Sequence, residues 1–201
     1  MNEVDFMKHT RLVVSFVTAM VLAAVGVAQK TVERGAMDRK NLAVQAMHKT
    51  APEMEKLKDL LGTWTTTEKH EPSKWSHGGE GKGSSVARLG PGGFSIMEDY
   101  TSTMPMGPFI GHGVTVWDAT ERVYKLYWFD SMIPVALEQD CRWEASDFVC
   151  MGEMTIEGKR IKSKITTTGI TPISHILTYE SSSDGGPMKK MMTITHTKSA
   201  E

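Results

Sequence analysis

The sequence lacks most of the motifs by which enzymes and metal proteins are recognised. It contains two cysteines, and no His-Glu-x-x-His, Gly-x-Ser-x-Gly or Cys-x-x-Cys pattern. The stretch "GGEGKGSS" resembles a phosphate loop, but Gly83 stands where a hydroxyl residue must follow Gly-Lys. We therefore assign no catalytic residue, no metal ligand and no cofactor.

The sequence also lacks an excess of charge of either sign. Its 23 Lys+Arg and 24 Asp+Glu give a net charge of -1. Binding to nucleic acid or to anionic membranes depends on an excess of positive charge, so we expect no nucleic-acid partner. The length of 201 residues corresponds to one domain with some additional chain.

Long apolar runs are missing except near the start, where "LVVSFVTAMVLAAVGVA" follows Lys8 and Arg11. The run ends in small residues, with Gly26 and Ala28 at the positions that a cleavage site requires. This pattern predicts a secretory signal peptide over residues 1–28. The competing interpretation is an uncleaved anchor helix, since about 20 apolar residues span a bilayer. We expect an exported protein, periplasmic or secreted, with no stable membrane anchor after cleavage.

Export bears on the two cysteines, Cys141 and Cys150. In "CRWEASDFVC" they flank a polar turn candidate at Ala145–Asp147, so the two strands of a hairpin would place them opposite each other. In an oxidising compartment such a pair is more often bridged than catalytic. We predict a disulfide; the alternative is two separate buried thiols.

What the sequence does contain is a helix pattern followed by many strand patterns. Residues 29–49 are polar and aperiodic, which indicates a linker or a frayed helix. Thr50 and Glu53 have capping-box spacing, and Gly62 can end the helix. The strands that we expect span 62–69, 81–89, 93–103, 109–118, 122–130, 134–143, 147–156, 159–168, 173–181 and 187–197.

Short connections rich in Gly, Pro, Asp and Ser separate these strand candidates, with no helix between them. Such an order favours sequential hairpins, and closing them into a barrel removes exposed strand edges. We predict an all-β domain over residues 50–198: a single antiparallel up-and-down β-barrel of about ten strands, preceded by one short helix. A β-sandwich is the alternative.

The motif "LLGTW" at the start of the first strand resembles the start of calycin barrels, the lipocalins and fatty-acid-binding proteins. That resemblance implies structural roles for Gly62 and Trp64, with the tryptophan closing the narrow end of the barrel beneath the helix. Its indole N–H can reach a backbone carbonyl there.

The segments "GGFSIMEDYTSTM", "GHGVTVWDATERVYKLYWFDS" and "DGGPMKKMMTITH", in this order after the helix, are similar to the bacterial domain-of-unknown-function family 1579. This resemblance implies a calycin-like barrel. It carries no assigned catalytic residue.

The most aromatic part of the chain, residues 117–130, supplies candidate ligand-binding residues. Alternating residues of a strand point to opposite faces, so either phase directs aromatics into the barrel. We select Trp117, Tyr127 and Trp128 as walls of a lumen. Ordinary core packing is the alternative, because small barrels fill their interiors with side chains.

Methionine and histidine give further candidates. Met97 belongs to a methionine-rich mature chain, and thioethers suit adaptable apolar sites. His112 and His196 alternate in phase with apolar residues, so each can face the interior. The alternatives are a copper site built on the "TMPMGP" methionines and a haem held by one such imidazole, as in nitrobindin-like barrels.

We predict that the barrel binds a small apolar or amphipathic molecule in its lumen. Two alternatives stay open. One is a structural or protein-interaction role in the cell envelope with a filled barrel, and the other is an enzyme with acid and base residues at the barrel mouth.

Overall fold

The computed structural model describes residues 51–73 and 76–199. The predicted signal peptide (1–28), the predicted linker (29–49) and Thr50 lie outside the described residues.

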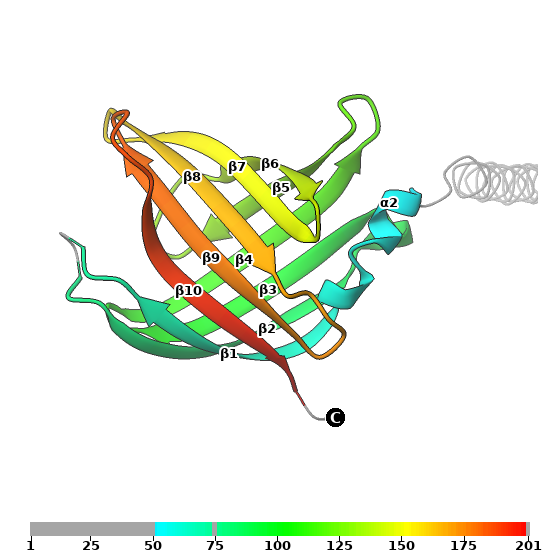
Figure 1. Ribbon diagram of the computed structural model, residues 1–201, viewed down its shortest axis with the longest axis horizontal. Coiled ribbons are helices and arrows are strands. Elements are labelled where there is room, and N and C mark those ends of the chain that lie inside the picture. The colour runs from blue at the N-terminus through cyan, green and yellow to red at the C-terminus, as the bar shows by residue number, and fades with distance from the viewer. Residues whose placement is uncertain (1–50, 74–75, 200–201) are drawn as a thin grey trace, which may run out of the picture. The chain divides into compact units, whose positions relative to one another are not determined.

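Ten antiparallel strands close into one barrel (Figure 1). Each strand pairs with its neighbours in the chain, and β1 pairs with β10 to complete the circle. The prediction of an up-and-down barrel is confirmed. The strands are β1 (Gly62–His70), β2 (Gly79–Leu89), β3 (Ser95–Met104), β4 (Gly107–Asp118), β5 (Val123–Asp130), β6 (Leu137–Glu144), β7 (Asp147–Ile156), β8 (Lys159–Thr168), β9 (Ser174–Ser183) and β10 (Lys189–Lys198).

The hairpin of β6 and β7 has the register that the cysteine spacing indicated. Only Ala145 and Ser146 connect the two strands, and Ala145 takes a left-handed backbone conformation with φ of 55°. Cys141 then lies opposite Cys150, and a disulfide joins them. Both cysteines are buried, so the bridge lies on the inner side of the barrel wall.

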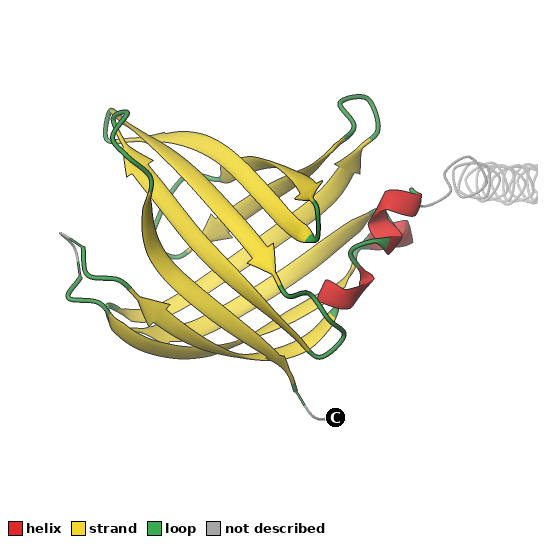
Figure 2. Ribbon diagram, viewed as in Figure 1, coloured by secondary structure: helices red, strands yellow, loops and turns green. Residues whose placement is uncertain are grey.

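The predicted short helix is present but ends earlier than its sequence pattern indicated. It comprises α2 (Pro52–Glu55) and a separate 3₁₀ turn, η1 (Lys58–Leu60), and both lie across one end of the barrel (Figure 2). Helices this short are not stable alone, so packing determines their geometry. Met54 and Leu57 are both buried, and the chain bends between them to keep both in the core. No helix among residues 51–73 and 76–199 is long and apolar enough to cross a membrane.

Trp64 closes the barrel beneath this helical segment. Its side chain is 1 % exposed, and its indole Nε1 donates a hydrogen bond to the Leu60 carbonyl at 3.1 Å. The Lys198 ammonium lies 4.3 Å from the centre of the Trp64 ring and donates a hydrogen bond to the Leu61 carbonyl. Gly62 begins β1 with φ of +123°, a conformation that favours glycine. The first strand is therefore fixed to the helix by two side chains, one from each end of the domain.

The end of the barrel under the helix is packed with aromatic side chains. Tyr124 donates a hydrogen bond to the Glu53 carbonyl at 2.8 Å, which holds α2 in place. Its ring packs edge-on against Trp117 and Phe148, and Phe148 in turn contacts Trp143. The hydrophobic core therefore lies at this closed end.

We expect Trp64→Ala to lower the free energy of unfolding by about 3–5 kcal/mol, because it removes a large buried ring and leaves a cavity. Chemical denaturation followed by circular dichroism measures this loss. Val86→Ala is the control: Val86 is 42 % exposed, and its replacement should change stability by no more than about 0.5 kcal/mol. Equal losses in the two variants would contradict a closing role for Trp64.

Candidate functional site

A cavity of about 440 Å³ occupies the barrel interior. Leu57, Leu60 and Trp64 form its floor, and residues of the connections at the opposite end form its mouth. Its volume lies within the range of about 300–1,000 Å³ that is typical of small-molecule sites. Most of its lining is apolar, with a few polar side chains among the apolar ones.

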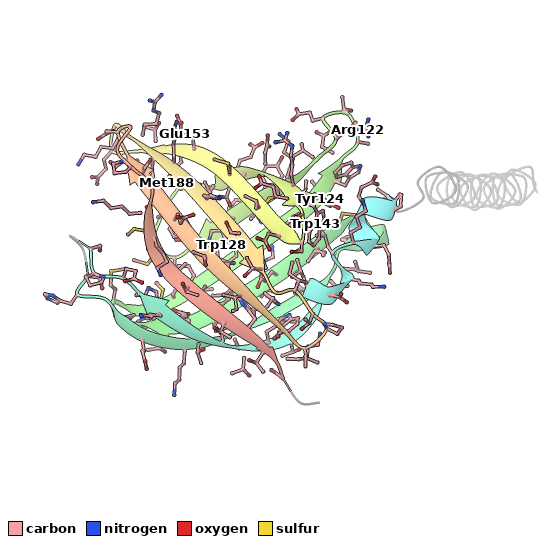
Figure 3. The ribbon with its side chains drawn as sticks, in the orientation of Figure 1. Arg122, Tyr124, Trp128, Trp143, Glu153 and Met188 are labelled. Atoms are coloured by element: carbon pink, nitrogen blue, oxygen red, sulfur yellow. A yellow bond between two sulfur atoms is a disulfide. The ribbon has the colours of Figure 1, made fainter. Side chains whose placement is uncertain are left out.

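Trp128 forms one wall because β4 presents glycine opposite it. Gly113 pairs directly with Trp128, and the ring also covers Gly111. A Cβ atom at Gly111 would lie 2.2 Å from the indole ring, so a side chain there would displace the ring, whereas one at Gly113 would lie 3.1 Å from it and require a smaller shift. The Trp128 indole Nε1 donates to Asp130 at 3.2 Å, which fixes the ring further. Figure 3 shows Trp128 in the middle of the barrel, while Arg122 lies on the connection between β4 and β5.

Of the six side chains that the sequence predicted to bind a ligand, two line the cavity and four do not. Trp128 and His196 line the cavity. Trp117 packs against Tyr124 at the closed end and does not line it. The remaining three, Met97, His112 and Tyr127, lie in the opposite strand phase and are also absent from the lining.

A carboxylate held by hydrogen bonds lies in the cavity wall. Glu68 is 4 % exposed, and its Oε1 accepts a hydrogen bond of 2.5 Å from the Tyr100 hydroxyl. The other oxygen, Oε2, lies 2.5 Å from Nε2 of His70. Thr66 forms a further hydrogen bond with the Tyr100 hydroxyl at 3.2 Å. Burial, with the hydrogen bond to Glu68, raises the pKa of the Tyr100 hydroxyl, so Tyr100 stays a donor.

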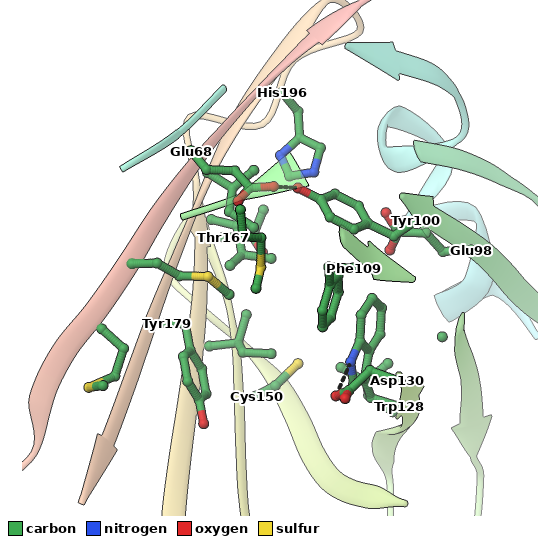
Figure 4. A pocket seen from close by; sticks show the side chains of 18 of the residues that line it. Glu68, Glu98, Tyr100, Phe109, Trp128, Asp130, Cys150, Thr167, Tyr179 and His196 are labelled. Atoms are coloured by element: carbon green, nitrogen blue, oxygen red, sulfur yellow. Dashed lines mark hydrogen bonds between the residues drawn. The ribbon is translucent and has the colours of Figure 1, made fainter. Parts of the chain in front are cut away.

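Glu98 is a second carboxyl group of the lining, on the strand that carries Tyr100 (Figure 4). Burial raises the pKa of the Glu98 carboxyl, and the charge of neighbouring Asp99 acts in the same direction. Asp99 itself points out of the barrel, where it pairs with Arg88 and His112. Glu98 and Asp99 are therefore neighbours in one strand, but Glu98 points into the cavity and Asp99 points to the outer face.

Two stacked imidazoles lie at the floor. His175 and His196 stack with ring centres 4.2 Å apart, and the edge of Trp64 meets His175 at 4.6 Å. Burial, with the charge of Lys198, lowers the pKa of His175 to about 4. Burial, with the charge of His175, lowers the pKa of His196 to about 3. Both rings are therefore neutral at physiological pH.

The mouth of the cavity combines methionines with fixed acids. Five methionines line this part of the site: Met104, Met106, Met132, Met191 and Met192. Asp130 accepts hydrogen bonds from the backbone N–H groups of Met132 and Ile133, at 2.8 and 2.9 Å, and so orders the connection after β5. Flexible thioethers can adapt to ligands of different shape.

Within the described part of the chain, no group of three or more His, Cys, Asp or Glu side chains is arranged to hold a metal ion. The sequence patterns did not identify Glu68, Tyr100 or His175 as residues of the site, and they named Glu98 as an acid that could pair for acid and base chemistry. The sequence does contain an indication for Glu68. Trp64, Thr66 and Glu68 are every second residue of one strand and therefore share a face, and Trp64 was expected to point into the barrel. Glu98 and Tyr100 alternate in the same way with Ile96.

A family model described as "Protein of unknown function (DUF1579)" matches residues 49–198. No curated protein matches the sequence.

Solved structures similar to the chain include Rv2717c from M. tuberculosis, with a TM-score of 0.54 and 11% identity over 76% of this chain and 100% of that chain. The S-type phycobiliprotein lyase CPES from Guillardia theta has a TM-score of 0.48 and 13% identity over 73% of this chain and 92% of that chain. A redesigned β-barrel, mFAP1, bound to DFHBI has a TM-score of 0.37 and 17% identity over 70% of this chain and 96% of that chain. The first of these shows a shared barrel fold.

We expect Glu98→Gln to stabilise the protein above pH 4.5 and to leave its stability unchanged well below that pH. A carboxyl whose pKa is raised by folding is stable in the barrel while protonated, and it destabilises the fold as rising pH ionises it. Glutamine stays neutral throughout. Thermal unfolding at pH 3 and pH 8 measures the difference between variant and wild type.

The other titratable groups that line this cavity are the same in both proteins, so the difference isolates Glu98. They are Glu68, His70, Glu71, Tyr100, Asp130, His175, Tyr179 and His196. A melting-temperature difference that is equal at both pH values would contradict a raised pKa for Glu98.

Proposed function

The chain belongs to the DUF1579 family of proteins of unknown function, and we propose that this member binds a small apolar or amphipathic molecule in the lumen of its barrel. The cavity of about 440 Å³ carries this proposal. It is large enough for a small organic molecule, and its largely apolar lining would gain from exclusion of water.

The cavity also weighs against the main alternative. A barrel with a purely structural role needs no internal space, and interiors of small barrels are usually filled by side chains. Here β4 places Gly113 opposite Trp128 and Gly111 under the same ring, and the buried hydrophobic cluster that includes Met54, Leu57 and Tyr124 lies at the closed end. Space in the lumen therefore follows from the residues of the wall.

The distribution of groups with shifted pKa bears on the enzyme alternative. That alternative expects such groups to converge at the mouth. The groups of the lining with a shifted pKa are His175 and His196 at the floor beside Trp64, together with Glu98, Tyr100 and Tyr179. The support for binding therefore comes from the cavity and not from these groups.

Export is part of the same proposal. The apolar segment that ends at Ala28 supports it, and so does the disulfide between Cys141 and Cys150, because disulfides persist in oxidising compartments. N-terminal sequencing of the protein from cells should give a chain that begins at Gln29. A chain that retains residues 1–28 would contradict cleavage.

The binding proposal predicts that N-phenyl-1-naphthylamine, a neutral apolar dye, becomes fluorescent when it enters the lumen. Trp128→Ala should weaken its binding about tenfold or more, because the aromatic wall is lost. Fluorescence titration measures the affinity, and circular dichroism checks that the variant is folded. Tyr127→Ala is the matched control, since Tyr127 is the neighbouring aromatic of the same strand and does not line the cavity.

A second variant tests the site by filling it. Thr115 lines the cavity from β4, so Thr115→Trp should occupy the space and reduce dye binding in a folded protein. Unchanged affinity in both lumen variants, or equal losses in Trp128→Ala and Tyr127→Ala, would contradict binding in the lumen.

A further inference from the structure

Apart from three histidines, the charged groups of the cavity are acidic. Four carboxyl groups line it, from Glu68, Glu71, Glu98 and Asp130. No lysine or arginine of residues 51–73 and 76–199 lines it. The nearest cation at the floor, Lys198, lies against the Trp64 ring and the Leu61 carbonyl and is not part of the lining. Of the histidines, His70 is already paired with Glu68, and the two at the floor have a lowered pKa. A carboxylate or phosphate group in this lumen would therefore meet no lysine or arginine.

Most of these carboxyl groups already have protein partners. Glu71 forms an ion pair with Lys190 at 3.3 Å, and Asp130 orders the connection after β5. Glu68 accepts hydrogen bonds on both oxygens from Tyr100 and His70. Glu98 differs, because no lysine, arginine or histidine of the described residues forms an ion pair with it. Its neighbour is the neutral side chain of Ser85, which lowers its pKa as a hydrogen-bonding group and supplies no counter-charge, so a cationic ligand could still pair with it.

Two buried imidazoles of the lining have a ring nitrogen without a hydrogen bond. His175 is 6 % exposed and His196 is 3 % exposed, and Nδ1 of each makes no hydrogen bond within the described chain. Buried polar atoms are almost always hydrogen-bonded, so in a cavity wall their partner is a molecule in the cavity, either water or a ligand. A neutral imidazole can accept a hydrogen bond from an N–H or O–H group.

The aromatic side chains near Glu98 favour positive charge as well. The Tyr100 ring lies 6.1 Å from that of Phe109 and 6.5 Å from that of Trp128, and all three line the cavity. The faces of aromatic rings carry partial negative charge and attract ammonium groups. Carboxyl groups together with aromatic faces are the chemistry that recognises an organic amine.

We propose that the ligand is a cationic amphiphile, a protonated amine on an apolar body, whose ammonium group binds between Glu98, Glu68 and the surrounding rings. The apolar body lies along Trp128 toward the methionines of the mouth. This inference rests on the proposed function, because it names the ligand class of the same lumen. It excludes fatty acids and other anionic lipids as the preferred ligands.

Three probes with the same naphthalene body test the charge preference: 1-naphthylmethylammonium, 1-naphthalenemethanol and 1-naphthoate. Each is used at pH 7.5 to displace N-phenyl-1-naphthylamine from the full mature chain. We expect the ammonium probe to bind about tenfold more tightly than the alcohol, and the carboxylate to bind most weakly, because charge-assisted hydrogen bonds are the stronger ones.

Glu98→Gln should lower the affinity for the ammonium probe about tenfold and leave the affinity for the alcohol unchanged. Asp99→Asn is the matched control, because it removes one negative charge from the same strand on the outer face, where Asp99 pairs with Arg88 and His112. It should change neither affinity. Glu68→Gln is the second variant, and it should also lower the ammonium affinity.

The outcomes separate this inference from the proposed function. If the dye binds and the carboxylate competes as well as the ammonium probe, binding in the lumen stands and the cationic ligand is wrong. If Glu98→Gln and Glu68→Gln both fold and both keep the ammonium preference, the assigned anchor is wrong. If the dye does not bind to the wild type, both proposals fail.

Discussion

The pairing of β1 with β10 is the constraint on which the rest of the structure depends. These strands come from the two ends of the domain, and their register runs from Trp64 opposite Lys198 to His70 opposite Met192. Closure removes both exposed edges of the sheet. It also places Glu68 of the first strand near His196 of the last and sets Lys198 over Trp64. The floor of the lumen, where His196 and Lys198 meet Trp64, therefore exists only in the closed barrel.

The two ends of the barrel differ in how densely their side chains pack. At the closed end, α2 and η1 lie over an aromatic core held by Trp64 and Tyr124. Toward the mouth the strands carry glycine, serine and threonine beside methionine, and the interior is not filled. The well-packed end stabilises the fold, so the other end is free to be hollow.

The buried polar groups of the lumen oppose folding. Neutral imidazoles such as His175 and His196, placed away from water, lower stability unless something compensates them. Residues held at a cost in stability are common where a ligand supplies the missing interactions. The hydrogen bonds around Glu68 show the contrasting case, in which Tyr100 and His70 supply the partners from within the protein.

The sequence by itself determined the strands, the turns and the local pairings. Turn residues separate the ten strands, the short β6–β7 connection aligns Cys141 with Cys150, and Trp64 follows Gly62 as it does in calycin barrels. Each of these features depends on neighbours within a few residues. Only the tertiary structure decided which face of each strand points inward, and it placed Trp128 and His196 in the lumen while leaving Tyr127 and His112 out of it. Alternation with period two fits either phase equally well, and the register between β1 and β10 depends on contacts between residues more than a hundred positions apart. The meeting of Glu68 with Tyr100 came from the consecutive pairing of β1, β2 and β3 and from the inward face of these strands, which no local pattern fixed.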